Sequence, residues 1–98
     1  MKFDEIINSE MPTLVDFTAA WCGPCQVLAP ILQRTAGKVS GKVRILKVDI
    51  DKNPGAARHY QVHSVPTLIL FRKGEVLWRQ SGVLPENQLV DVLLRHAG

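Results

Sequence analysis

The spacing of hydrophobic residues along the chain predicts an alternation of helices and strands. Apolar residues recur at helical spacing in several segments. Other segments are continuously apolar or rich in β-branched residues, as buried strands are. In chain order we expect a helix over 3–8, a strand over 13–18, a helix over 26–39, a strand over 43–50, a helix over 54–60, strands over 67–71 and 76–80, and a last helix that Pro85 opens.

Proline, asparagine and glycine indicate where these elements begin, bend and end. Asn53 is expected to cap the helix that starts at Pro54. Pro30 lies inside the long helix and predicts a bend there. The short turn over 72–75 contains Gly74 and predicts a hairpin between the last two strands.

This order of elements predicts an α/β fold. The first two strands are joined through a helix, so they should be parallel with a right-handed crossover. The closing hairpin adds antiparallel strands. We therefore expect a mixed four-stranded sheet with helices on both faces. With 98 residues, the chain should form a single domain over 1–98.

The composition is that of an ordinary soluble chain, with 46% hydrophobic and 21% charged residues. No apolar run approaches the roughly 20 residues that span a bilayer. The first residues lack the apolar core of a signal peptide, so we expect a cytoplasmic protein that binds no membrane. The net charge is +3, and basic residues concentrate between Arg34 and Arg58 without interleaved aromatics. That pattern favours a solvated face over a nucleic-acid site.

The chain has two cysteines, Cys22 and Cys25, placed between a strand and the long helix. Side chains three positions apart on a helical turn lie about 5–6 Å apart, which a disulfide tolerates. The amino end of a helix carries free N–H groups and partial positive charge, which favour a thiolate. Cys22, outermost at that end, should therefore be the exposed and reactive thiol, with Cys25 buried.

Two alternatives remain for the cysteine pair. Inert buried thiols are one, and a zinc half-site with His59 and His63 is the other. The two histidines have the spacing of zinc ligands, but they lie much farther from Cys25 than in a zinc finger, and a predicted strand intervenes. We expect a redox pair and no metal site. In such a pair Cys22 attacks a substrate disulfide, and Cys25 then resolves the mixed disulfide.

Asp16 is a carboxylate within an apolar strand. Burial would raise its pKa and make it a base for deprotonating Cys25. The alternative is an aspartate that reaches solvent or a backbone donor. Lys47, on the neighbouring strand, either pairs with Asp16 and tunes it or is a surface lysine.

These residues resemble the thioredoxin family over nearly the whole chain. The run Trp21-Cys22-Gly23-Pro24-Cys25, followed by Val65-Pro66-Thr67, carries most of the resemblance. Single positions add to it, namely Val15, Asp16, Phe17, Pro30, Lys47, Asp51, Asn53, Pro54, Phe71, Gly74 and Gly82. The resemblance implies a thioredoxin-like fold and a protein-disulfide reductase with no bound cofactor. It would take electrons from NADPH through a thioredoxin reductase.

The resemblance also implies roles for particular residues. It favours Asp16 as the base and implies a cis bond between Val65 and Pro66, facing the disulfide. The Val65 backbone would then be free to pair with an extended client segment. An apolar patch around Cys22 would bind clients. Its expected members are Trp21, Gly23, Pro24, Val65, Pro66, Gly82 and Val83, although Val83 could instead be a core residue.

Two competing functions remain open. An oxidase or isomerase is disfavoured by the Gly23-Pro24 pair. A non-catalytic module that binds another protein is the second alternative. Otherwise we expect a monomer whose partners are disulfide-containing proteins and the reductase.

Three departures from the family pattern affect these expectations. There is no room for the strand that usually precedes the first helix, which is why four strands are expected and not five. Thr18 stands where a tryptophan is common beside the active site. Gln26 stands where a lysine is common, which removes a positive charge near the thiolate.

Overall fold

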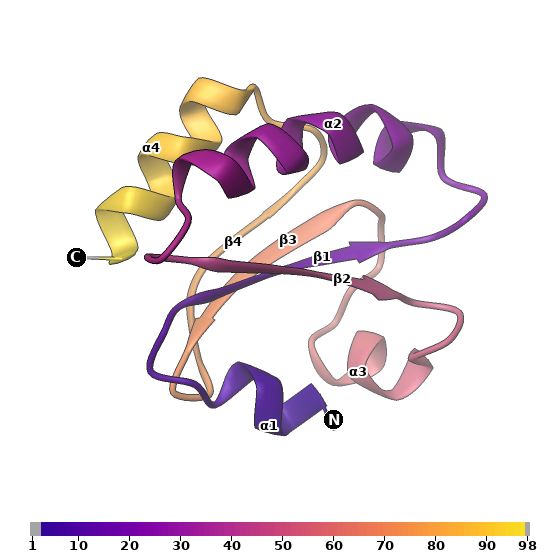
Figure 1. Cartoon of the computed structure of the whole chain (residues 1–98). Coiled ribbons are helices and arrows are strands. Elements are labelled where there is room, and N and C mark those ends of the chain that lie inside the picture. The colour runs from indigo at the N-terminus through magenta and orange to yellow at the C-terminus, as the bar shows by residue number, and fades with distance from the viewer. Residues whose placement is uncertain (1–2, 98) are drawn as a thin grey trace.

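The computed structural model describes residues 3–97, which form four helices and four strands in the order α-β-α-β-α-β-β-α (Figure 1). The elements agree closely with those expected from hydrophobic spacing. They are α1 (Phe3–Ile7), β1 (Thr13–Thr18), α2 (Gly23–Lys38), β2 (Arg44–Asp49), α3 (Pro54–His59), β3 (Thr67–Arg72), β4 (Glu75–Ser81) and α4 (Glu86–Ala97).

The strands form one mixed sheet in the order β2-β1-β3-β4. β1 pairs in parallel with β2, whereas β1 with β3 and β3 with β4 are antiparallel. The central strands β1 and β3 are almost wholly buried, which explains their continuous apolar sequences. The predicted mixed four-stranded α/β architecture is confirmed.

Helices cover both faces of the sheet, with α2 and α4 on one side and α1 and α3 on the other (Figure 1). Successive side chains of a strand point to opposite faces. Leu14 of β1 therefore joins the core under α2 and α4, and Val15 joins the core under α1 and α3. Each strand of the sheet centre contributes to two separate hydrophobic layers.

Two helix boundaries differ from the prediction. α2 begins at Gly23, three residues before Gln26, because Pro24 fits the first turn and the Cys22 side chain caps it. α3 does begin at Pro54, but Asn53 makes no side-chain cap. Asn53 is the N-cap residue, as expected, but its side-chain nitrogen donates to the Asp49 carbonyl at 3.0 Å and does not cap α3.

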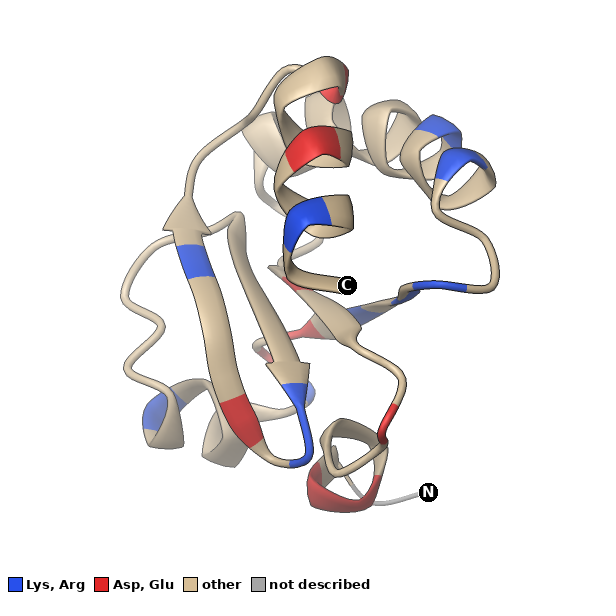
Figure 2. Ribbon diagram, turned by 90° about the vertical axis from the view of Figure 1, so that its left-hand side faces the viewer, with Lys and Arg blue, Asp and Glu red and all other residues tan. Residues whose placement is uncertain are grey.

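Charged residues of both signs are spread over the helices and along the outer strand β4 (Figure 2). One ionic cluster joins the two helices on the same face. Arg34 and Lys38 of α2 each approach Glu86 of α4 at 2.5 Å. These contacts hold the pKa of Glu86 below its usual range. Among residues 3–97, no helix has the length and hydrophobicity to cross a membrane.

Candidate active site

The two cysteines lie at the amino end of α2, shortly after the end of β1, and they are joined as a disulfide. Cys22 is the N-cap residue of α2, and Cys25 lies in its first turn, with a Cα–Cα distance of 5.3 Å. The Cys22 amide donates to the Ala19 carbonyl at 3.1 Å, which closes the loop after β1. The backbone N–H of Cys25 donates to Cys22 Sγ at 3.2 Å. A helix N–H directed at a sulfur favours its thiolate form.

Solvent exposure does not distinguish the two cysteines. Cys22 is 4% exposed and Cys25 is 5% exposed. The expectation that Cys22 is exposed is therefore wrong for the disulfide form. The cause is packing, since Ala19, Ile50 and Val65 enclose the pair. The two sulfurs differ in their hydrogen bonding, because Cys22 Sγ accepts the backbone N–H of Cys25.

The loop before β3 brings Val65 and Pro66 to the disulfide. The bond between them is cis, as predicted. Cys22 Sγ lies 3.5 Å from the Val65 carbonyl oxygen. The Gly82 amide donates to the Pro66 carbonyl at 2.9 Å. The structure thus links three of the expected client-binding positions to one another or to Cys22, although they are far apart in sequence.

The members of the expected client-binding patch differ in their exposure to solvent. Trp21 is 69% exposed, and its indole N–H donates to Asp51 Oδ2 at 2.9 Å. Gly23 and Pro24 are exposed as well. Val83 is 38% exposed, so the alternative in which it is a core residue is wrong. Pro66 is buried and Val65 is half-buried.

Asp16 is a buried acid in the middle of the sheet, 1% exposed. Its Oδ1 has no hydrogen-bond partner among the described residues. Burial raises the pKa of Asp16 to about 6, and the positive charge of Lys47 opposes that shift. The alternative in which this carboxylate reaches solvent is wrong. A carboxyl group with such a pKa can take up or release a proton near neutral pH.

Lys47 lies next to Asp16 on the neighbouring parallel strand. The two residues are register partners of β1 and β2. Within residues 3–97, no salt bridge joins them, and Lys47 is exposed. Its influence on Asp16 is therefore electrostatic and acts over a longer distance than a direct ion pair. Both residues line an apolar hollow beside Leu32 and Ile45.

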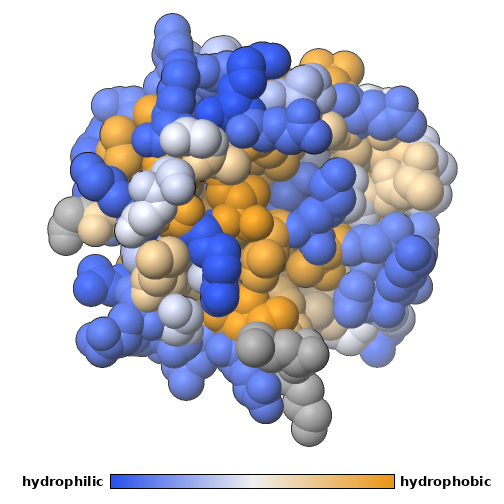
Figure 3. All heavy atoms as spheres, in the orientation of Figure 1, coloured by the Kyte–Doolittle hydropathy of each residue, from blue (hydrophilic) through white to orange (hydrophobic). Residues whose placement is uncertain are grey.

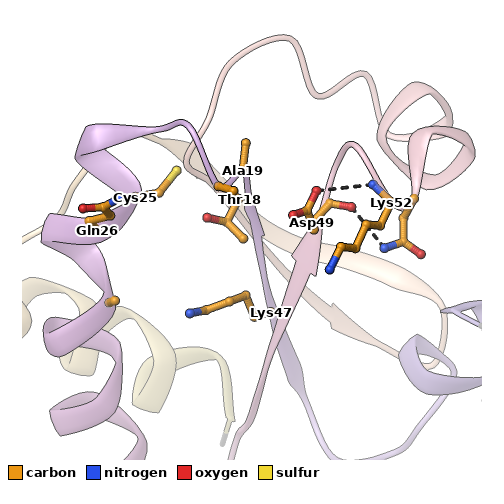
Figure 4. A pocket seen from close by; sticks show the side chains of 10 residues that line it. Thr18, Ala19, Cys25, Gln26, Lys47, Asp49 and Lys52 are labelled. Atoms are coloured by element: carbon orange, nitrogen blue, oxygen red, sulfur yellow. Dashed lines mark hydrogen bonds between the residues drawn. The ribbon is translucent and has the colours of Figure 1, made fainter.

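A second hollow, of about 520 Å³, opens behind the disulfide at the carboxyl ends of β1 and β2 (Figure 4). We call it the basic hollow. It shares Ala29 and Lys47 with the apolar hollow. Figure 3 shows hydrophobic surface along the β2 edge, beside the apolar hollow. Its lining consists of Thr18, Ala19, Ala20, Cys25, Gln26, Ala29, Lys47, Asp49, Lys52 and Asn53.

Sequence reasoning assigned no functional role to Lys52 or Asp49. A signal for them existed, because Asp49 ends the parallel strand β2 and Lys52 lies in the turn after it. The carboxyl ends of parallel strands meet at one edge of a sheet, where ligands bind. His59 and His63, by contrast, are not drawn into the site. No group of three or more metal-binding side chains occurs within residues 3–97, so the zinc alternative has no ligand set there.

Comparison with known proteins gives a consistent result. A family model described as Thioredoxin matches residues 1–95. "Thioredoxin" of Staphylococcus haemolyticus is 48% identical over 95 residues, which cover 97% of this chain and 90% of that protein. "Thioredoxin 2" of Chlorobaculum tepidum is 43% identical, with 96% and 86% covered. "Thioredoxin" of Haemophilus influenzae is 42% identical, with 93% and 85% covered.

Proposed function

The chain belongs to the thioredoxin family, and we propose that it is a general reductase of protein disulfides that a thioredoxin reductase recharges with electrons from NADPH. Exchange between a dithiol and a disulfide is the activity of this family, and Cys22 and Cys25 supply the pair. The chain is thus a protein-disulfide oxidoreductase. The observation that carries the proposal is the cysteine pair at the amino end of α2, with the Val65 carbonyl beside one sulfur.

Cys22 is the attacking thiolate in this proposal. It forms a bond to one sulfur of the client disulfide, and the other client sulfur leaves as a thiolate. The Cys25 thiolate then attacks Cys22 Sγ, which closes the protein disulfide and releases the second client thiolate. The N–H of Cys25 directed at Cys22 supports this order, since it stabilises negative charge on Cys22.

Asp16 is the base that deprotonates Cys25, directly or through water. Its burial and its pKa of about 6 support that role, because such a group exchanges protons close to neutral pH. Lys47 tunes Asp16 from the neighbouring strand through its positive charge. A lysine that stabilises the carboxylate keeps the base available at lower pH.

Clients bind over the surface around Cys22 formed by Trp21, Gly23, Pro24, Val65, Pro66, Gly82 and Val83. The exposed indole of Trp21 and the exposed Val83 side chain supply apolar contact area. The Val65 backbone pairs with an extended client segment, as in strand addition to a sheet edge. We further propose a single domain over 1–98 that works as a cytoplasmic monomer without a bound cofactor, nucleic acid or membrane.

Insulin reduction tests this proposal directly. The protein is mixed with insulin, NADPH and a thioredoxin reductase, and NADPH consumption is followed beside the Cys22→Ser variant. We expect steady turnover for the unaltered protein and none above background for Cys22→Ser. Absence of turnover with every reductase tried would favour a non-catalytic binding module instead.

A further inference from the structure

We propose that the basic hollow is a binding site for small anionic thiols and directs them to Cys25, so that they reduce the disulfide from the side opposite the clients. The inference rests on the proposed redox role of the pair. It adds a second substrate class, thiols that carry carboxylates, and a second point of attack.

The hollow reaches only one of the two cysteines. Cys25 contributes to its lining, whereas Cys22 does not. Cys22 instead faces the Val65 carbonyl at 3.5 Å. In Figure 4 the Cys25 side chain leaves α2 toward Thr18 and Ala19, into the space in front of β1. The volume of about 520 Å³ lies within the range of small-molecule sites.

The charge of the hollow favours an anion. Lys47 and Lys52 enter it from β2 and from the turn after β2, and Figure 4 shows both ammonium groups directed into the space. Neither lysine takes part in a salt bridge within residues 3–97. Asp49 is the acidic residue of the lining, and its Oδ1 accepts from the Asp51 and Lys52 amides at 2.8 and 3.3 Å. Two cations therefore face one carboxylate that is already hydrogen-bonded.

The chemistry needs no further reagent than the thiol itself. The incoming thiolate forms a bond to Cys25 Sγ, the Cys22–Cys25 bond breaks, and its electron pair leaves on Cys22. A second thiolate attacks the incoming sulfur and frees Cys25 as a thiolate. Two small thiols are oxidised to one disulfide, and the protein disulfide is reduced to two thiols.

The identity of the leaving group makes attack on Cys25 favourable. Thiolates of lower pKa leave faster in disulfide exchange. Attack on Cys25 expels Cys22, whose sulfur accepts the Cys25 N–H at 3.2 Å at the amino end of α2. Attack on Cys22 would instead expel Cys25, and no helix N–H donates to its sulfur among the described contacts.

The test compares reduction of the protein disulfide by mercaptosuccinate, 2-mercaptoethanol and cysteamine, which are anionic, neutral and cationic. Each rate constant is divided by that of the same thiol with a small neutral disulfide, which removes differences in thiol pKa. We expect a normalised preference of about five-fold for mercaptosuccinate over 2-mercaptoethanol, and the lowest value for cysteamine. Equal normalised rates would overturn the proposal.

Two variants and a matched control locate the site. Lys52→Gln should lower the preference about two-fold, and Thr18→Trp should remove it by filling the hollow. Lys42→Gln, the same change at an exposed lysine outside this lining, should leave it unchanged. An equal loss in Lys42→Gln would show that net charge alone is responsible and would contradict the site.

Acid quenching followed by peptide mapping identifies the attacked sulfur. The proposal requires the first mercaptosuccinate adduct on Cys25, and an adduct on Cys22 would refute it. Insulin turnover is measured on the same samples. Intact turnover with the adduct on Cys22 would remove this inference and leave the proposed function standing.

Discussion

The two faces of the sheet are built from the same strands, yet their contents differ sharply. Under α1 and α3, β1 and β3 contribute apolar side chains, among them Phe17 and Phe71, and two buried threonines, Thr13 and Thr67, whose hydroxyls donate to backbone carbonyls. The Phe3 ring lies 6.0 Å from each of these rings, centroid to centroid. Under α2 and α4, β1 places a buried carboxyl group, that of Asp16, on the same face of the sheet as Leu14.

The difference teaches how stability and chemistry are separated within one strand. Asp16 and Phe17 are adjacent in sequence, but alternation sends them to opposite faces. On the mainly apolar face under α1 and α3, β1 and β3 carry no ionisable group that folding must bury. The face under α2 bears the cost of an ionisable group without a partner for Oδ1, next to the helix that starts with the cysteines. The predictions that follow test whether the two faces are independent in this way.

The largest effect on stability is expected on the apolar face. Phe17→Ala removes a fully buried ring and should lower the free energy of unfolding by about 3–5 kcal/mol. Urea unfolding measures this loss, and insulin turnover per folded molecule should stay unchanged. Val27→Ala, at an exposed valine of α2, should change stability by less than about 0.5 kcal/mol. A large fall in turnover per folded Phe17→Ala molecule would break the separation of the faces.

On the opposite face, Asp16→Asn should increase stability at pH 7 by about 3 kcal/mol. The pKa of Asp16 is about 6 when folded, above its unfolded value of 3.8. Between these values the folded state holds a proton that the unfolded state has lost, so stability falls as pH rises through about 4 to 6. Above pH 6 the full loss persists, at 1.36 kcal/mol per pKa unit.

Urea unfolding at pH 4, 5 and 7 checks this expectation. The difference between Asp16→Asn and the unaltered protein should grow through that window and then level off. Glu75→Gln, at an exposed carboxylate of β4, serves as the control and should show no such growth. A difference that is the same at pH 4 and pH 7 would mean that ionisation of Asp16 costs the fold nothing.

The same substitution should slow catalysis. Without the Asp16 carboxylate, Cys25 is deprotonated less readily, and we expect at least a ten-fold fall in the rate of insulin reduction at pH 7. In the unaltered protein part of the rate should rise as pH passes about 6, where the base becomes available. Rates for Asp16→Asn that match the unaltered protein from pH 5 to 8 would exclude Asp16 as the base.

The smallest effect is expected for Lys47→Gln. Lys47 lowers the pKa of Asp16 by its charge alone, across a strand pair that contains no salt bridge between these two residues. Its loss should raise the pKa of Asp16 by a fraction of a unit, since interactions with exposed charges are weak. NMR titration of the Asp16 carboxyl carbon measures the shift. A fall in this pKa would reverse the role given to Lys47.

The sequence predicted the sheet well because its signals are local. The span Thr13–Thr18 was predicted to the residue, since an apolar run between Pro12 and the cysteine turn allows few other structures. The start of α2 was predicted too late because the cysteine turn itself belongs to the helix, with Cys22 as its cap. Caps depend on side-chain geometry, which residue type alone does not determine.

The site was predicted in part, for a similar reason. The cis Val65–Pro66 bond and the burial of Asp16 agree with expectation. The burial of Cys22 was missed because it depends on Ile50 and Val65, which approach from distant parts of the chain. The basic hollow was missed as well. The smaller residue at position 18 was noted as a lost aromatic contact, but not as the opening of a space beside Cys25.

Trapping of a client tests the central claim, that Cys22 attacks and Cys25 resolves. Cys25→Ser keeps the attacking thiol and lacks the resolving one, so a mixed disulfide between Cys22 and an insulin chain should accumulate. Cys22→Ser retains only the thiol behind the loop and should capture almost none. Mass spectrometry of both variants after incubation with insulin gives the answer. Equal capture by the two variants, or greater capture by Cys22→Ser, would contradict the assignment.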